Sequence, residues 1–151
     1  YNEELVVPAI AFLPNVPPTI VEERVSHIDF IPTLIDLLGH KIPEEFQGEI
    51  MKGGRPLYFA IQSHKYKIGM IDQELKVILD MNKKLIEVYN LTEDPNELNK
   101  LDSRKFTNKI LKLLFWHHCQ IDHYKKEKWN SKKEDRCTKN NNFNYSNSPL
   151  N

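Results

Sequence analysis

The sequence predicts an α/β protein built from two unlike parts and a tail. Residues 1–56 combine a nearly continuous apolar run, typical of a strand buried on both faces of a parallel sheet, with a helix that carries one apolar stripe. Residues 57–129 carry short strand-like runs and then a long helix, which predicts a small antiparallel sheet packed by that helix. Residues 130–151 lose the apolar pattern and are predicted to form a disordered polar tail.

The composition excludes several classes of protein. The 151 residues are 40% hydrophobic and 28% charged, which is typical of a globular chain with one core. The formal net charge is +0, so we predict no nucleic-acid partner. No apolar stretch approaches the roughly 20 residues that span a bilayer. The two cysteines, Cys119 and Cys137, are too few for a disulfide scaffold and leave the redox compartment open.

The first part contains one predicted strand and one predicted helix. The run Leu5–Leu13 is typical of a strand buried on both faces, and Pro8 favours its start or a sheet edge. The prolines of 14–18 exclude a helix there, and apolar residues at helical spacing then follow. We predict Asp29 as the N-cap of this helix and Gly39 as its left-handed end. The apolar stripe comprises Ile28, Ile31, Leu34, Ile35 and Leu38. Since the chain lacks an initiator Met and enters a strand almost at once, we expect an excised piece of a longer protein.

The second part alternates strand-like runs with polar turns. Asp94–Leu98 is predicted to be a capped helical turn with Pro95 at its first position. A longer helix is expected from about Ser103 to about Trp129. The predicted strands are Leu57–Gln62, Lys65–Ile71, Leu75–Leu79 and Leu85–Tyr89. The predicted buried face of the long helix comprises Ile110, Leu113, Leu114, His117, Ile121 and Tyr124.

Four features occur in an order that resembles the late part of the sulfatase family, within the alkaline phosphatase superfamily. They span roughly residues 1–101. The features are the tyrosine–acidic–apolar–Val-Pro entry Tyr1–Pro8; the run Val25–Asp29 with Pro32-Thr33-Leu34 and Asp36–Gly39; the Gln-Gly of Phe46–Gly48; and Lys65–Lys67 followed by Glu87–Leu91 and Asp94–Glu97. In the last feature Asn90 stands where the family usually has Asp.

This resemblance implies the C-terminal fragment of an alkaline-phosphatase-like fold, with residues 1–56 ending the catalytic sheet domain and residues 57–129 forming a C-terminal subdomain. Sulfatases hold a nucleophile beside a divalent cation, Ca²⁺ or Mg²⁺, and related transferases use Mn²⁺. The cation neutralises charge on the ester and activates the nucleophile. The family's Cys/Ser-x-Pro-x-Arg and Asp-His-Gly runs do not occur in this chain. The resemblance therefore implies no catalytic residue, metal ligand or cofactor here.

The resemblance also carries expectations about the parent protein. The parent is expected to be a sulfuric ester hydrolase that acts on a small-molecule or glycan ester, while this chain alone is inactive. Its partner is the remainder of the catalytic domain. Because the family's Asp-His-Gly lies shortly before the segment that matches Tyr1, we hypothesise that Tyr1, Glu3 and Glu4 line the mouth of the active site. Family members are secreted, periplasmic, lysosomal or membrane-anchored, so the compartment stays open.

Other residue groups favour structural roles. Ser26, His27 and Asp29 are too close in sequence to converge as a catalytic triad, and we expect capping and loop hydrogen bonds from them. Cys119 and His123 have helical spacing for a metal, but with His117 and His118 they do not provide a matched ligand set. The lysines from Lys125 to Lys133 are interleaved with acids, as in a solvated helix end.

Two further functional classes remain open. Phosphoethanolamine and glycerolphosphate transferases share the superfamily and would use a Thr nucleophile. A non-catalytic interaction module would equally lack a nucleophile and metal ligands. The sequons Asn90-Leu91-Thr92 and Asn144-Tyr145-Ser146 decide nothing without evidence of secretion.

Overall fold

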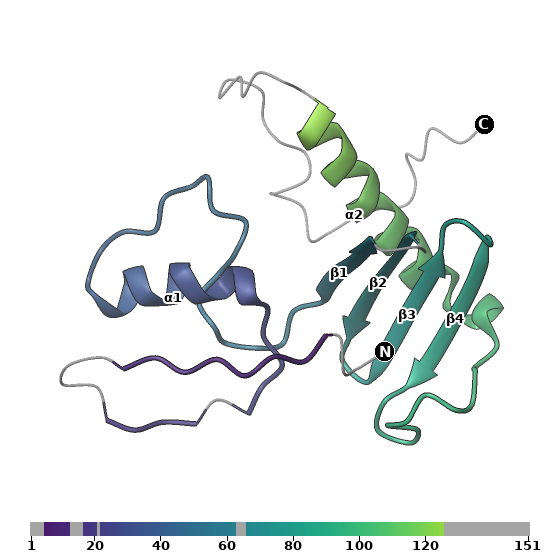
Figure 1. The fold of residues 1–151 in the computed structure, drawn as a ribbon, viewed down its shortest axis with the longest axis horizontal. Helices are drawn as coiled ribbons and strands as arrows, with labels where there is room; N and C mark the ends of the chain where they lie inside the picture. Colours follow the sequence, from purple (N-terminus) through teal and green to yellow (C-terminus); the bar gives the residue numbers. More distant parts are fainter. Residues whose placement is uncertain (1–4, 13–16, 21, 63–65, 126–151) are drawn as a thin grey trace.

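The computed structural model describes residues 5–12, 17–20, 22–62 and 66–125, with side chains to residue 122. The element order is η2 (His27–Asp29), α1 (Phe30–Leu37), β1 (Leu57–Gln62), β2 (Tyr66–Asp72), β3 (Leu75–Asp80), β4 (Leu85–Asn90), η3 (Ser103–Phe106) and α2 (Thr107–Lys125). A mixed α/β fold results, in which an antiparallel sheet packs against a long helix and α1 lies to one side (Figure 1). The α/β fold class, with its small antiparallel sheet packed by a long helix, is confirmed.

The sheet is a meander of four antiparallel strands in the order β1-β2-β3-β4. Because side chains alternate between the two faces of a strand, one face presents Ile68 and Met70 from β2 and Val77 from β3. These side chains are 0% exposed and pack against Ile110 and Leu113 of α2. Figure 1 shows α2 crossing this sheet. The predicted strands are therefore correct to within one residue at each end.

The face of α2 that packs on the sheet is narrower than predicted. Ile110, Leu113 and His117 are buried as expected, but Leu114 is 37% exposed. The helix also begins later than predicted, since Ser103–Phe106 is a 3₁₀ turn capped by Asp102, which accepts the Arg104 N–H at 3.2 Å. Salt bridges from Lys109 (2.6 Å) and Lys112 (3.8 Å) to Asp72 join the helix to the end of β2.

The other sheet face buries charge as well as apolar surface. Lys76 is 0% exposed, and its Nζ lies 2.7 Å from Oε1 of Glu97. Glu87 on β4 pairs with Lys100. Next to them, the ring of Phe59 on edge strand β1 covers Gly69 of β2, the residue directly opposite. A Cβ at position 69 would collide with this ring, so the glycine is required by close packing.

Asp94–Glu97 is a turn and not the helical turn that the sequence predicted. Asp94 does act as a cap, because its carboxylate accepts the N–H groups of Leu98 (3.1 Å) and Asn99 (2.7 Å). Glu97, however, has a φ of 56°, which a right-handed helix excludes. The side chain of this same Glu97 forms the ion pair with Lys76.

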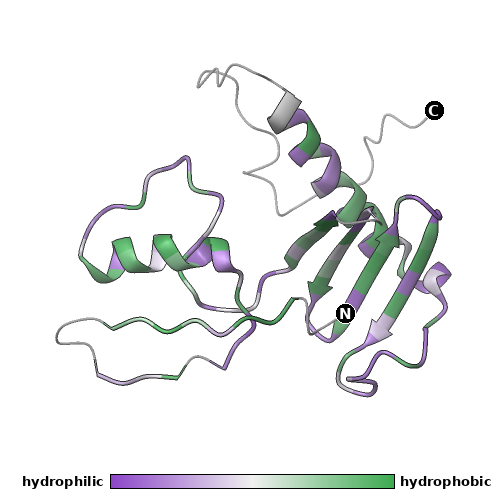
Figure 2. Cartoon of the chain, in the orientation of Figure 1, coloured by the Kyte–Doolittle hydropathy of each residue, from purple (hydrophilic) through white to green (hydrophobic). Residues whose placement is uncertain are grey.

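Residues 6–12 form no strand, contrary to the prediction for Leu5–Leu13; Leu13 itself lies outside the described residues. The segment is extended and mostly hydrophobic in Figure 2, yet Val6, Ile10 and Phe12 are 74%, 77% and 94% exposed. A strand needs backbone hydrogen bonds to a neighbour, and the described sheet is formed by β1–β4 without this segment. The pattern correctly identifies apolar character but not a strand within this chain.

Candidate functional site

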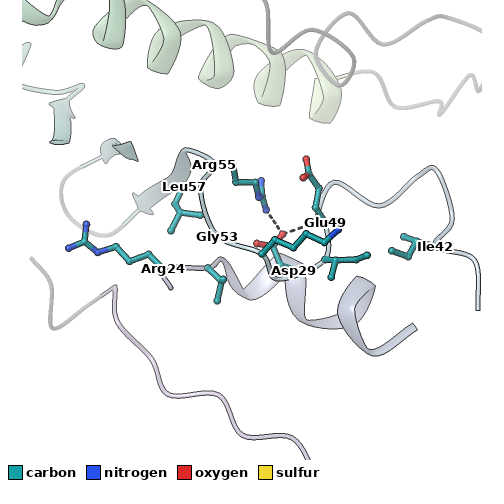
Figure 3. A pocket seen from close by; sticks show the side chains of 11 residues that line it. Arg24, Asp29, Ile42, Glu49, Gly53, Arg55 and Leu57 are labelled. Carbon is teal, nitrogen blue, oxygen red and sulfur yellow. Dashed lines mark hydrogen bonds and ion pairs between the residues drawn. The ribbon is translucent and has the colours of Figure 1, made fainter. Parts of the chain in front are cut away.

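Asp29 is the centre of the most highly connected polar cluster in the N-terminal part. It directly precedes α1 and is 2% exposed. Its Oδ2 accepts the Ser26 N–H at 3.1 Å, and its Oδ1 accepts the Glu49 N–H at 2.9 Å. The guanidinium of Arg55 donates to the same Oδ1 (Figure 3). We call Asp29, Ser26, Glu49 and Arg55 the Asp29 clasp, because they join three separate segments of the chain.

Thr33 extends this connection along α1. Its hydroxyl donates to the Asp29 carbonyl at 2.6 Å and accepts the Met51 N–H at 2.9 Å. Gly48 allows the loop to approach this closely, since a Cβ there would collide with the Ile28 carbonyl. The loop that contains Gly48 is therefore held against the start of α1. The residues responsible are Asp29 and Thr33 of the helix motif and Gly48 of the Gln-Gly motif.

The sequence predicted Asp29 as the N-cap of the helix, and its position there is confirmed, although its side chain bonds elsewhere. Asp29 occupies the N-cap position of α1, but its side chain makes no cap hydrogen bond to that helix. The carboxylate accepts the preceding Ser26 N–H instead, which caps the short η2 turn. Gly39, with a φ of 75°, ends α1 as predicted, and the His40 N–H donates to the Ile35 carbonyl at 3.0 Å.

The clasp borders a hollow of about 340 Å³. It lies between the Gly48–Gly53 loop, the start of β1 and the segment before η2, and Arg24, Asp29, Glu49, Lys52 and Arg55 supply its charged lining. Arg24 points away from Asp29 in Figure 3 and donates to the Gln73 carbonyl at 3.1 Å. Arg55 and the backbone N–H groups of Ser26 and Glu49 thus satisfy the buried carboxylate of Asp29, which holds the loop against the start of the helix.

The Ser26, His27 and Asp29 run forms no triad in the structure. Asp29 is bound to backbone N–H groups and to Arg55, and His27 is exposed. The structural role predicted for Asp29 is thus confirmed. Arg55 was missed, because Gly53–Pro56 was interpreted only as a boundary. A buried carboxylate needs a cation, and this requirement was the available signal.

The structure describes three of the four side chains in the predicted histidine and cysteine cluster on α2. His117 is buried, and its Nε2 lies 2.6 Å from Oη of Tyr66 on β2. Burial, with the neighbouring His118, lowers the pKa of His117. Cys119 is disulfide-bonded, and the side chain of His123 lies outside the described ones. Within residues 5–12, 17–20, 22–62 and 66–122, no three His, Cys, Asp or Glu side chains converge as a metal site would require.

Tyr1, Glu3 and Glu4 lie outside the described residues, so their proximity to an active site stays a prediction. The same holds for the predicted tail at 130–151. Of the helices that the structure describes, none has both the length and the apolar character for a membrane span.

No family model matches the sequence, and no curated protein matches it. Similar solved structures include BT4656 in complex with its substrate D-glucosamine-2-N,6-O-disulfate (22% identity, TM-score 0.49, 70% of this chain and 25% of that chain). Others are BT1596, a 2-O GAG sulfatase (23%, 0.48, 74% and 28%), and a sulfatase from a Bacteroides thetaiotaomicron locus for glycosaminoglycan metabolism (19%, 0.48, 68% and 27%). This chain spans about a quarter of each of them. The similarity is one of fold alone.

Proposed function

We propose that this chain is the C-terminal portion of a sulfatase-like, metal-dependent hydrolase of sulfate or phosphate esters, and that it does not cleave an ester alone. The Asp29 clasp carries the proposal. It brings together the Val25–Asp29 run and the Phe46–Gly48 run, two motifs that are apart in sequence and resemble the family in the same order. Motifs that meet through specific contacts support a shared fold better than isolated matches do.

The proposed partner of this chain is the remainder of the catalytic α/β domain. Val6, Val7 and Phe12 are 74%, 69% and 94% exposed, and Ile31 of α1 and Leu38 just after it are 49% and 62% exposed. Apolar residues at both even and odd positions of an extended segment fit a strand that is covered on both faces. Exposed apolar surface of this kind marks an interface, so we assign the segment and α1 to contact with a larger sheet.

The divalent cation is proposed to bind residues of the parent that lie outside this chain. The described side chains provide no converging set of ligands, so no chemical step is derived from them. When bound, such a cation neutralises the charge that develops on the ester oxygens. The role of this chain is to position its helix and loop against the catalytic sheet.

The test is an assay of the full-length parent and of this chain with p-nitrophenyl sulfate and p-nitrophenyl phosphate. The parent is expected to hydrolyse one of them, to lose activity with a chelator and to regain it with Ca²⁺, Mg²⁺ or Mn²⁺. The isolated chain is expected to be inactive. Transfer of a phosphoethanolamine group without hydrolysis would instead identify a transferase, and a parent inactive with all these substrates and metals would refute the proposal.

A further inference from the structure

Asn90 ends edge strand β4 and begins the tripeptide Asn90-Leu91-Thr92, which satisfies the acceptor pattern for N-linked glycans. The sequence alone could not decide whether the asparagine is presented in a usable way. The structure shows the strand ending at Asn90 and a turn following at residues 91–93, in which Thr92 is exposed. An acceptor asparagine needs this surface position.

The side-chain amide of Asn90 is oriented by two backbone donors. Its Oδ1 accepts the N–H groups of Thr92 at 3.0 Å and of Glu93 at 3.3 Å. Because both donors face the oxygen, the Nδ2 group is directed away from the turn, and the described residues supply no hydrogen-bond acceptor for it. Among the described residues, the nitrogen that a glycan would occupy therefore has no hydrogen-bond partner, while the oxygen stabilises the turn.

The surroundings leave room for a bulky substituent. β4 is an outer strand of the sheet, at the edge opposite β1, and α1 with the Asp29 clasp lies on the β1 side (Figure 1). A glycan on Asn90 would thus stay clear of the surface assigned above to the catalytic domain. It would shield the end of an edge strand, which is otherwise a site for unwanted strand pairing.

A second observation concerns the compartment. Cys119 of α2 is disulfide-bonded, and disulfides form and persist in oxidising environments such as the lumen of the endoplasmic reticulum and the cell exterior. Proteins acquire N-linked glycans on the same route. The disulfide and the half-buried acceptor Asn90, with exposed Thr92, therefore both fit a protein that passes through the endoplasmic reticulum.

We propose that Asn90 is an N-glycosylation site of the secreted or lumenal protein. In the transfer, Nδ2 of Asn90 attacks the anomeric carbon of a lipid-pyrophosphate-linked oligosaccharide. The C–O bond to the pyrophosphate breaks, the pyrophosphate lipid leaves with the electron pair, and Nδ2 gives one proton to a base of the transferase. One N–H and the Oδ1 remain, so both hydrogen bonds that Oδ1 accepts in the turn are retained.

The experiment uses the full-length protein expressed in a eukaryotic secretory host, with Asn144→Gln removing the other sequon. Treatment with peptide N-glycosidase F in H₂¹⁸O converts a glycosylated asparagine to ¹⁸O-labelled aspartate, which mass spectrometry locates. Label is expected at position 90 and not at Asn96 or Asn99, neither of which has Ser or Thr two residues later. Label should disappear in Thr92→Ala and persist in Thr92→Ser.

Thr92→Ala is the informative variant, because it keeps Asn90 and both hydrogen bonds to its oxygen and so should fold normally. A secreted protein with unlabelled Asn90 would overturn the proposal. Retention of the protein in the cytosol would overturn it as well, and so would equal labelling in Thr92→Ala.

Discussion

Arg55 places its guanidinium against Oδ1 of Asp29, and this pair joins the chain entering β1 to the start of α1. The side chain of Asp29 is 3% exposed and that of Arg55 26%. A carboxylate this deeply buried is stabilised only if its hydrogen-bond partners are all in place. The stability of the N-terminal part should therefore depend strongly on one charge.

Asp29→Asn is expected to lower the free energy of unfolding by about 1.5–3 kcal/mol, the range for hydrogen bonds to charged groups. The amide can accept only at its oxygen, so Arg55 loses its counter-charge and a backbone N–H loses its acceptor. Urea unfolding of the protein measures the effect. Asp36→Asn, on the exposed side of α1, is the matched control and should change stability by less than about 0.5 kcal/mol. Equal effects would contradict the clasp.

Gly48→Ala is expected to displace the loop from α1. The added Cβ would meet the carbonyl of Ile28, which is backbone and cannot move aside as a flexible side chain would. Gly54→Ala serves as the comparison, because nothing lies near its Cβ and only its φ of 78° penalises alanine. Amide hydrogen exchange should show Glu49 and Met51 losing protection in Gly48→Ala alone. Unchanged protection there would disprove the packing argument.

Lys76→Met is expected to destabilise the sheet by about 3–5 kcal/mol, the usual cost of removing one member of a buried ion pair and leaving the other charge unpaired. Glu97 Oε2 already has no hydrogen-bond partner among the described groups, and Oε1 would lose the Lys76 ammonium at 2.7 Å. Adding Glu97→Gln removes the unpaired charge and should recover part of the loss. A double variant that is no more stable than Lys76→Met would argue against this pairing.

The stability of the C-terminal part should fall in mild acid because of His117. Burial, and next the charge of His118, lowers the pKa of His117, while Tyr66 holds the neutral ring from β2. The unfolded chain, with a histidine pKa of about 6.5, therefore takes up a proton at a higher pH than the folded protein. Stability is complete above about pH 6.5 and decreases as the pH falls below it, until folded His117 is protonated too.

Thermal unfolding across this pH range measures the effect. His117→Asn should flatten the pH dependence of the unfolding temperature. His118→Asn should keep most of that dependence, because the native His118 side chain is 71% exposed. A profile with the same slope in both variants would exclude His117 as the titrating group.

The C-terminal subdomain was largely predictable, because its information is local. Alternating strand patterns and turn residues define β1–β4, and the apolar stripe places Ile110 and Leu113 on the sheet. The extent of the stripe was not predictable: Leu114 is 37% exposed, although Trp116 and His117 further along α2 still contact β1 and β2. The turn at Glu97 was missed because a left-handed φ at a non-glycine residue has no signal in the local sequence pattern, and its ion-pair partner Lys76 is distant in sequence.

The candidate site was harder to predict, because its contacts also join residues that are far apart in the sequence. Asp29 was correctly assigned a structural role, but its partners Glu49 and Arg55 are far from it in sequence. Spacing rules describe neighbours on one helix or strand, and they contain no information about a loop that returns to the helix. The Leu5–Leu13 run failed differently: a strand is a property of a pair, and one apolar segment cannot supply its own neighbour.

The glycine beneath the ring of Phe59 has a consequence for how the two parts of the chain are aligned. If β1 slid along β2 by two residues, the ring would lie on Lys67 or Ile71 instead of the vacant position at Gly69. The Phe59 ring thus fills the space that a side chain at position 69 would occupy, and this fit favours the observed pairing of β1 with β2. Since Arg55 lies just before β1, a shifted strand would carry its guanidinium out of reach of Asp29. The fit of one ring in the sheet sets the register on which the clasp in the neighbouring part depends.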